Sequence, residues 1–435
     1  MSFVLAAAPA EVNTGDTAWM LVATALVLLM TVGLGLFYAG LVRAKNSLNT
    51  FMMCIAALAV ATVTWAFVGY SLAFDGDGAI TGGLGHAFMS GVGFEPRDET
   101  TIPHLVFFAF QATFCIITTA LVSGAVVERM RFGPFLVFAA LWSVLVYSVM
   151  AHWAFGGGWL QEQGTLDFAG GVPVEMGSGF SALAAALVVG ARKDFGRQAL
   201  LPHNAVYCLL GAGLLWFGWF GFNGGSGFST GNASVLAFTN TLLTPACALL
   251  GWFVLDVIRG RQVTAIGAAT AIIVGCVAIT PAGGFISPIW AMVLGFLCAV
   301  PSYIVIVWRT RAGVDETLDV LAAHGIAGLF GIVFIGLVAQ VSWNDAADGL
   351  LYGDGGQLVS QLVAAVAAPA YAFGMTFALL KLIGAVMPLR GSDHDEAVGM
   401  DIVHHGEEAY ASGEGAILIT AEADVADKLP VGSIA

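Results

Sequence analysis

The stretch AWMLVATALVLLMTVGLGLFYAGL at 18–41 decides the fold class. It contains no Asp, Glu, Lys or Arg, and it exceeds the roughly 20 residues that an α-helix needs to cross a bilayer. Lipid cannot bond to backbone N–H and C=O groups, so such a run crosses as a helix. Further apolar runs lie at 48–74, 103–127, 133–154, 171–190, 200–222, 233–258, 263–280, 284–307, 318–340 and 358–387. The sequence therefore predicts an all-α polytopic membrane protein with eleven transmembrane helices.

The composition agrees with this prediction and excludes a water-facing fold. Hydrophobic residues make up 58% of the 435 positions and charged residues 10%, whereas soluble domains have about 25% charged residues. The mean hydropathy is +0.88. The cysteines have no CxxC spacing and lie in apolar runs, so they are expected to be small buried side chains and not metal ligands. They are Cys54, Cys115, Cys208, Cys247, Cys276 and Cys298. No cofactor is expected.

The basic residues set the expected orientation. Lys and Arg favour cytoplasmic loops, and thirteen of the 15 fall in alternate breaks or in the tail, against one, Arg97, on the opposite side. The N-terminus is therefore expected outside and the C-terminus inside. Three segments follow: an extracytoplasmic segment at 1–17, a membrane domain at 18–390 and a cytoplasmic acidic tail at 391–435. The net charge of −14 is assigned to solvated loops and tail, so no nucleic-acid partner is expected.

Two halves of the chain share a pattern. Glu175 is followed four positions later by Gly179, and His324 four positions later by Gly328. GLGLFYAG at 33–40 also resembles WFGWFGFNGG at 216–225, and its glycines would allow close helix packing. Two five-helix halves must have opposite topology, which predicts a 5+5 inverted repeat plus one helix with the pathway at the interface.

Ionisable residues inside the spans are the candidate functional groups. A charged side chain there costs roughly 2.5–3.5 kcal/mol on insertion scales and usually faces a pore or the bundle interior. Glu175 and His324 are expected to meet in crossing helices, either as part of a pore or as a purely structural hydrogen bond. Asp167, in LDFAGG at 166–171, is expected to cap the helix that follows.

Six motifs then appear in a fixed order, each where the hydropathy requires it. They are GLGLFYAGLVRAKN at 33–46, FQATFCIITTALVSGAVVERMRF at 110–132, FGGGWLQEQGTLDFAGG at 155–171, WFGFNGGS at 219–226, DETLDVLAAHGIAG at 315–328 and MDIVHHGEEAY at 400–410. In these motifs the chain resembles the ammonium transporter family (Amt, Mep and Rh proteins), from about Asp16 to about Tyr410. The resemblance implies a homotrimer with one pore in each subunit.

The resemblance also implies roles for individual residues. An outer recruitment site matches Phe110 and Ser226, and a stacked gate matches Phe114 and Phe222. An essential aspartate below the vestibule matches Asp167. Aromatic faces suit a small cation because the ring quadrupole attracts it.

The sequence departs from the commonest family pattern at two positions. The first of two pore histidines is replaced by Glu175, as in a group of fungal transporters, while His324 keeps the second. The vestibule tryptophan aligns with Phe155, although Trp153 lies two residues earlier. Indole is the best aromatic partner for a cation, so either recruitment is weaker here or Trp153 serves instead.

These observations predict transport of ammonium across the cell membrane. Ammonium would be recruited outside and deprotonated near Asp167 and the Glu175–His324 pair, and ammonia would cross an apolar pore while Glu175 and His324 relay the proton. Methylammonium, the lipid bilayer and a cytoplasmic PII-type regulator are the other expected partners. The alternative is an ammonium sensor signalling through the tail, where Gly406 would form a turn and Tyr410 would dock on loops such as that of Asp315. An enzyme is disfavoured because HExxH is lacking and because one Glu and one His inside the spans are too few for catalysis.

Overall fold

The computed structural model describes residues 11–97 and 99–410, and its regular elements in this part of the chain are helices. Ten helical stretches there are long and apolar enough to cross a bilayer. They are Thr14–Leu41 (α1), Ala44–Phe74 (η1, α2, η2 and α3), His104–Ser123 (α4), Phe132–Glu162 (α5, η4, α6 and α7), Gly171–Val189 (η5 and α8), Ala205–Gly225 (α9), Asn232–Ile258 (α10), Pro288–Arg309 (within α12), Leu321–Val338 (η6 and α13) and Gly355–Val386 (α15). The membrane-spanning, all-α class is confirmed.

The expected span at 263–280 is a shorter apolar helix, Ala265–Ile279 (α11). At 1.5 Å per residue its 15 residues cover about 22 Å, less than the roughly 30 Å of a hydrocarbon core. The count of eleven spans therefore stays a prediction, as does the orientation. Of the three expected segments, residues 1–10 and 411–435 lie outside the described part of the chain.

Several spans are interrupted, and the chain has short helices outside them. The second span is divided into α2 (Ser47–Thr64), η2 (Trp65–Gly69) and α3 (Tyr70–Phe74), and the fourth into α5 (Phe132–Trp142), η4 (Ser143–Tyr147), α6 (Ser148–Phe155) and α7 (Trp159–Glu162). The fifth span is divided into η5 (Gly171–Met176) and α8 (Gly177–Val189). The span that contains His324 is divided into η6 (Leu321–Ile326) and α13 (Ala327–Val338). Here η2, η4, η5 and η6 are π-helical. The short helices are η1 (Ala44–Asn46), η3 (Ala87–Met89), α14 (Val341–Asn344), η7 (Leu350–Tyr352), α16 (Asp393–Val398) and α17 (Met400–His405), and α12 runs over Pro288–Ala312.

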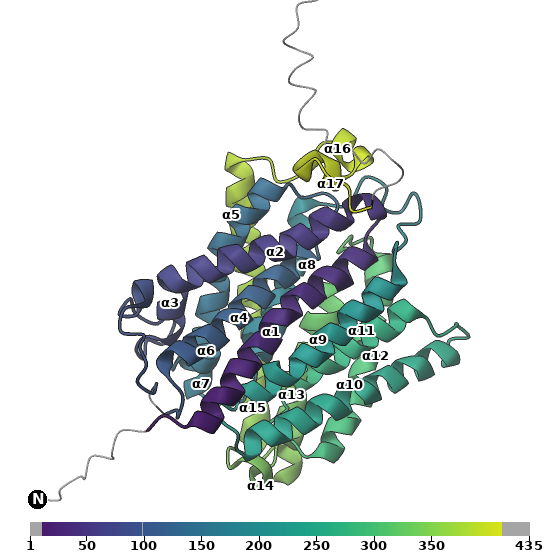
Figure 1. The fold of residues 1–435 in the computed structure, drawn as a ribbon. Helices are drawn as coiled ribbons and strands as arrows, with labels where there is room; N and C mark the ends of the chain where they lie inside the picture. The colour runs from purple at the N-terminus through teal and green to yellow at the C-terminus, as the bar shows by residue number, and fades with distance from the viewer. Residues whose placement is uncertain (1–10, 98, 411–435) are drawn as a thin grey trace, which may run out of the picture.

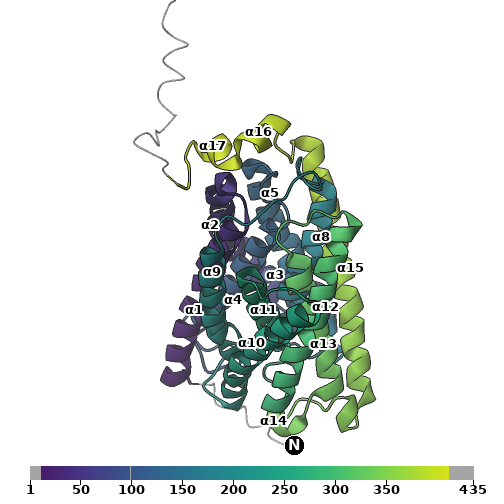
Figure 2. The same ribbon diagram turned by 90° about the vertical axis from the view of Figure 1, so that its right-hand side faces the viewer.

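The long helices form one tilted bundle (Figure 1). The helices α16 and α17 lie across one end, which we call the tail side, and α1 begins at the opposite end, which we call the vestibule side. The view turned by 90° shows the same arrangement, with α14 far from the tail (Figure 2).

Glycines let the helices α1 and α9 approach closely, as the sequence predicted. A Cβ on Gly211 would lie 2.4 Å from the nitrogen of Phe37, and one on Gly218 would lie 2.2 Å from Cγ of Met30. Real Cβ atoms do not approach other atoms so closely, so a larger residue at either position would push the two helices apart.

The two π-helical segments with candidate pore residues cross in the same way. A Cβ on Gly179 would lie 2.2 Å from the nitrogen of Gly325, and one on Gly328 would lie 2.4 Å from Cβ of Glu175. The glycines four positions after Glu175 and His324 thus sit at the crossing point. π-Helical turns often occur at functional sites, and here the two segments bring their ionisable residues to one place.

The tail docks on the bundle. Both carboxylate oxygens of Asp401 accept backbone N–H bonds, from Leu48 at 3.0 Å and Asn49 at 2.7 Å, so the tail caps the first turn of α2. Gly406 ends α17 with φ of 66°, which confirms the predicted turn. The expected partner of Tyr410 needs correction, because its hydroxyl bonds to the ring of His203, 2.8 Å away in the loop between α8 and α9, and not to the loop of Asp315.

Candidate transport pathway

A cavity of about 390 Å³ opens on the vestibule side. The sequence-predicted residues that line it are Phe114, Phe155, Asp167 and Ser226. The hydroxyl of Ser226 donates to the carbonyl of Phe222 at 2.8 Å, so its own oxygen lone pairs stay available to accept a bond from a cation. Aromatic faces and an acceptor oxygen therefore share one concave site.

Two other predicted recruitment residues do not line this cavity. Phe110 is fully buried, and its ring centroid lies 4.9 Å from that of Phe114. The ring of Trp153 packs against Trp159 and Tyr371, and its Nε1 donates to a backbone carbonyl in the loop at 75–86. Trp153 therefore lies outside the cavity that Phe155 lines, and a recruitment role for Phe155 stays a prediction.

The sequence reasoning missed the other lining residues, among them Phe107, Gln111 and Phe228. Phe107 and Gln111 precede Phe114 by seven and three positions, so one stripe of α4 faces the cavity. The guanidinium of Arg97 lies 4.1 Å from the ring centre of Phe107, and Phe228 packs beside that ring. The signal for Gln111 was its amide inside the apolar run FQATF, which is costly to bury without a function or a partner.

Asp167 forms the cap that the sequence predicted. Its Oδ1 accepts from the backbone N–H groups of Gly170 and Gly171 at 2.9 and 2.7 Å, and its Oδ2 accepts from Val172 at 2.7 Å. These donors begin η5, the segment that carries Glu175. The positive helix end favours the carboxylate, so Asp167 fixes the start of the pore segment while it lines the vestibule.

A stacked aromatic pair closes the floor of the vestibule. The ring centroids of Phe114 and Phe222 are 4.1 Å apart with an interplanar angle of 28°. Phe114 lines the outer cavity and Phe222 lines the next one inward. The two side chains therefore lie between the vestibule and an inner chamber, and their role as a gate stays a prediction.

The enclosed chamber is small and mostly apolar. Its volume is about 10 Å³, about the least that holds one water. Glu175 and His324 line it and meet there, with Oε2 of Glu175 2.8 Å from Nδ1 of His324. Both side chains are buried, and Oε1 of Glu175 has no hydrogen-bond partner within the described chain. The remaining lining residues are Met30, Leu34, Phe37, Ile117, Leu121, Val174, Leu215, Trp219, Phe222 and Ile273.

Comparisons with known proteins identify this architecture. The model of the Ammonium Transporter Family matches residues 18–410. The ammonium transporter of Bacillus subtilis is 44% identical over 399 residues, which cover 91% of this chain and 98% of that protein. The chain belongs to the ammonium transporter family.

Solved structures extend this result to the fold of the transporter. The crystal structure of Saccharomyces cerevisiae Mep2 has a TM-score of 0.82 at 33% identity and covers 88% of both chains. A structure described as a sensor Amt protein has the same TM-score at 26% identity and covers 90% of this chain and 98% of that one. The family is one of transporters, not of enzymes.

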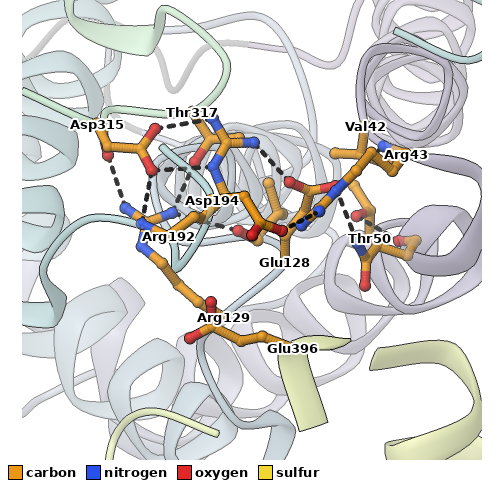
Figure 3. A network of polar contacts seen from close by, with 12 residues as sticks. Val42, Arg43, Thr50, Glu128, Arg129, Arg192, Asp194, Asp315, Thr317 and Glu396 are labelled. Carbon is orange, nitrogen blue, oxygen red and sulfur yellow. Dashed lines mark hydrogen bonds and ion pairs between the residues drawn. The ribbon is translucent and has the colours of Figure 1, made fainter. Parts of the chain in front are cut away.

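A polar network lies under the tail of the transporter (Figure 3). Glu128 is 1% exposed, and its carboxylate accepts from Arg43 at 3.0 Å, Asn46 at 2.8 Å and Arg192 at 2.5 Å. Burial acts to raise the pKa of Glu128, but Arg192 and Arg43 outweigh it and hold the pKa below its usual range. Glu128 is therefore a charged hub between three loops, which the count of basic residues in the sequence does not reveal.

The network reaches the inner pore segment. Arg192 binds both carboxylate oxygens of Asp315, at 2.9 and 2.8 Å. Arg129 is fully buried and donates to the Asp315 carbonyl and the Thr317 hydroxyl, at 2.7 and 2.6 Å. Burial lowers the pKa of Arg129 to about 10, so it stays charged near neutral pH. These bonds fix the loop that leads into η6 and His324.

Proposed function

We propose that this chain carries ammonium from the vestibule to the tail side and separates the proton from ammonia on the way. The observation that carries the proposal is the order of three sites along one path. An aromatic vestibule, a stacked Phe114–Phe222 gate and a buried Glu175–His324 pair follow one another. Each site suits one step: capture, exclusion of water, and proton transfer.

Capture depends on replacing water around a small cation. The rings of Phe107 and Phe155 provide π faces, each worth about 0.5–1 kcal/mol at an exposed site and more when desolvated. Ser226 and Gln111 add acceptor oxygens, since a hydroxyl and an amide carbonyl both accept N–H bonds. The carboxylate of Asp167 is already held by three backbone N–H groups. Asp167 therefore acts on the cation through its negative charge and by shaping the vestibule, and less as a direct hydrogen-bond acceptor.

Passage beyond the gate favours the neutral species. A chamber of about 10 Å³ with mainly apolar walls offers little hydration, and burying an unpaired charge in such surroundings is costly. The Glu175–His324 pair provides a route for the proton, because the carboxylate and imidazole are already in hydrogen-bond contact. Ammonia then crosses as the neutral molecule and the proton follows through the pair.

The cellular arrangement follows from the loops. The basic side chains Arg43, Arg129 and Arg192 gather on the tail side, which we assign to the cytoplasm by the positive-inside rule. The vestibule then faces outward from the cell membrane. We further propose a homotrimer, each subunit with its own path, and a PII-type regulator that would approach the tail side. Subunit number is checked by crosslinking in the membrane.

Uptake into proteoliposomes tests the proposed function. The wild-type chain should accumulate labelled methylammonium, ammonium should compete, and potassium should not at equal concentration. The matched controls are empty liposomes and a Glu175→Leu variant of the same trimer content. Accumulation equal to that of empty liposomes, or equal competition by potassium, would overturn the assignment.

A sensor is the second candidate function. Two observations favour it: the fold likeness to a sensor Amt protein and a tail tied to the membrane helices through Asp401. A sensor binds ammonium without sustained flux. Saturable binding to purified protein, combined with no uptake in the assay above, would select this alternative.

A further inference from the structure

A second carboxylate occupies the position that corresponds to Asp167 in the other half of the chain. Asp167 lies eight residues before Glu175, and Glu316 lies eight residues before His324. Each carboxylate bonds to the backbone at the start of a π-helical segment. Oε2 of Glu316 accepts from the N–H of Leu321, the first residue of η6, at 3.3 Å. Glu316 is thus the inner counterpart of the vestibule aspartate.

The two carboxylates differ in how many of their oxygens accept hydrogen bonds. Asp167 uses both oxygens on three backbone donors. Glu316 is 0% exposed, and its Oε1 has no hydrogen-bond partner among the described residues. A cap alone needs only one oxygen, and an unpaired buried carboxylate oxygen costs free energy if the group is ionised. Glu316 therefore retains an oxygen that is free to take up a proton.

The surroundings of Glu316 connect it to the tail side. Asp319, three residues on, forms an ion pair with Arg309 of α12 at 2.6 Å. Asp319 and Arg309 line a cavity of about 320 Å³ on that side, together with Arg192 and Thr317. Water in such a cavity is the natural acceptor for a proton released by a neighbouring carboxyl group.

The charged groups that face Glu316 set its titration. Burial raises the pKa of Glu316 to about 7, Arg309 opposes this rise and Asp319 adds to it. Asp315 is already paired with Arg192. The Tyr38 phenol of α1 donates to a backbone carbonyl of α4 and thus has its own partner. Glu316 therefore holds a proton at a higher pH than an ordinary glutamate does.

We propose that Glu316 is the proton-exchanging group on the tail side of the Glu175–His324 pair. A proton that leaves the pair bonds to a carboxylate oxygen of Glu316 and neutralises it. Its release to water in the cavity beside Asp319 restores the carboxylate. The step needs no further reactant. This inference rests on the proposed transport of ammonium with separation of its proton.

The test separates a proton carrier from a helix cap. Glu316→Gln keeps an amide oxygen for the Leu321 N–H but cannot ionise. Glu407→Gln, an exposed change in the tail and outside the cavities of the path, is the matched control. Ammonium-evoked currents on a solid-supported membrane are recorded while the tail-side pH is varied from about 5.5 to about 8.5, a range that brackets a carboxyl group with a raised pKa.

The wild-type current should rise as the tail-side pH rises through about 7, because Glu316 accepts a proton only when ionised. Glu316→Gln should lose this rise and carry at least about threefold less current, a change of about 0.65 kcal/mol in barrier. Glu316→Asp should keep the rise at lower pH, because aspartate is the stronger acid. This second variant tests the proposal even if Glu316→Gln fails to fold.

Two results would overturn the inference in distinguishable ways. Currents and pH profiles of Glu316→Gln and Glu316→Asp that match wild type would show that Glu316 only caps η6, with ammonium transport intact. Absence of an ammonium-evoked current in the wild-type chain would remove the proposed function itself, and this inference with it.

Discussion

The two halves of the pathway place an ionisable residue in the same way but stabilise it differently. On the vestibule side, Asp167 holds the start of η5 with three short backbone bonds within its own loop. On the tail side, Glu316 holds the start of η6 with one longer bond. The adjacent Asp315 instead receives its bonds from Arg192, on a different loop. The outer segment is thus fixed locally, and the inner segment is fixed by distant parts of the chain.

This difference suggests a division of tasks. A locally fixed segment presents a constant entrance to the substrate. A segment fixed through other loops responds to them: Met400 donates to Asn46 at 2.8 Å, Asn46 donates to Glu128, and Glu128 accepts from Arg192. Contiguous bonds therefore run from the tail to the loop before His324. Coupling along them is a hypothesis that requires functional tests.

The largest effect is expected when the backbone bonds from Asp167 to the start of η5 are removed. Asp167→Ala leaves three N–H donors without their acceptor, each at a cost of about 1–3 kcal/mol if buried, and frees the start of η5. Uptake should fall by more than about 100-fold, or about 2.7 kcal/mol of barrier. Uptake into proteoliposomes with matched protein content measures this fall.

Asp167→Asn sharpens this prediction. Both carboxylate oxygens accept bonds here, and asparagine has only one oxygen, so a flux between those of wild type and Asp167→Ala is expected. Flux close to wild type in Asp167→Ala would show that the outer segment does not depend on its cap.

The next effect concerns Glu175, where the two segments meet. Glu175→Leu removes the partner of His324 and should lower the ammonium-evoked current by more than tenfold, or about 1.4 kcal/mol. Glu175→His keeps a titratable group in contact and should stay within roughly tenfold of wild type with a shifted pH dependence. Currents across a pH series, with potassium as competitor, compare the three proteins.

Equal currents and equal selectivity in the three proteins would reduce Glu175 to a packing partner of His324. Gly328→Ala provides a separate check, because its Cβ would lie 2.4 Å from that of Glu175. Gly328→Ala should push apart the two segments that cross at Glu175. The variant should therefore give less folded protein as well as a lower flux.

The sequence predicts which segments cross the membrane, because this depends on composition. It does not predict which side chains face the pathway, because this depends on how each helix is rotated about its axis. Apolar runs locate the spans, and the positions of Glu175 and His324 near the starts of two crossing spans predict that they meet. Phe155 and Trp153 are two positions apart, so on one helix they point to nearly opposite sides. Only the structure decides which one faces the vestibule. The partner of Tyr410 and the free oxygen of Glu316 depend on loop packing, which no local pattern encodes.

A smaller effect is expected from the tail. Truncation after Gly399 removes Asp401, which caps the first turn of α2, and the bond between Met400 and Asn46. The chain of hydrogen bonds that leads from the tail to the loop before η6 then loses its first member. The rate should fall by about three- to tenfold, in the range of allosteric couplings of 1–3 kcal/mol, while the oligomer stays assembled.

Truncation after Tyr410 is the matched control, since it keeps every described tail contact and should transport like wild type. The same rate in both truncations would show that the inner segment does not depend on the tail. The comparison between a locally fixed and a remotely fixed segment would then fail.

The smallest effect is expected at the vestibule aromatic. Phe155→Trp introduces indole, the best cation–π partner, in a cavity that Phe155 already lines. A gain of about 0.5–1 kcal/mol would lower the KM for ammonium by about two- to fivefold and leave the maximal rate unchanged. Because the change acts only on the outer half, the pH profile that we attribute to Glu316 should not move. Phe217→Trp, on the exposed surface of α9, is the control and should alter neither quantity. A changed pH profile in Phe155→Trp would mean that the two halves are not independent, and an unchanged KM would mean that Phe155 does not contact the cation.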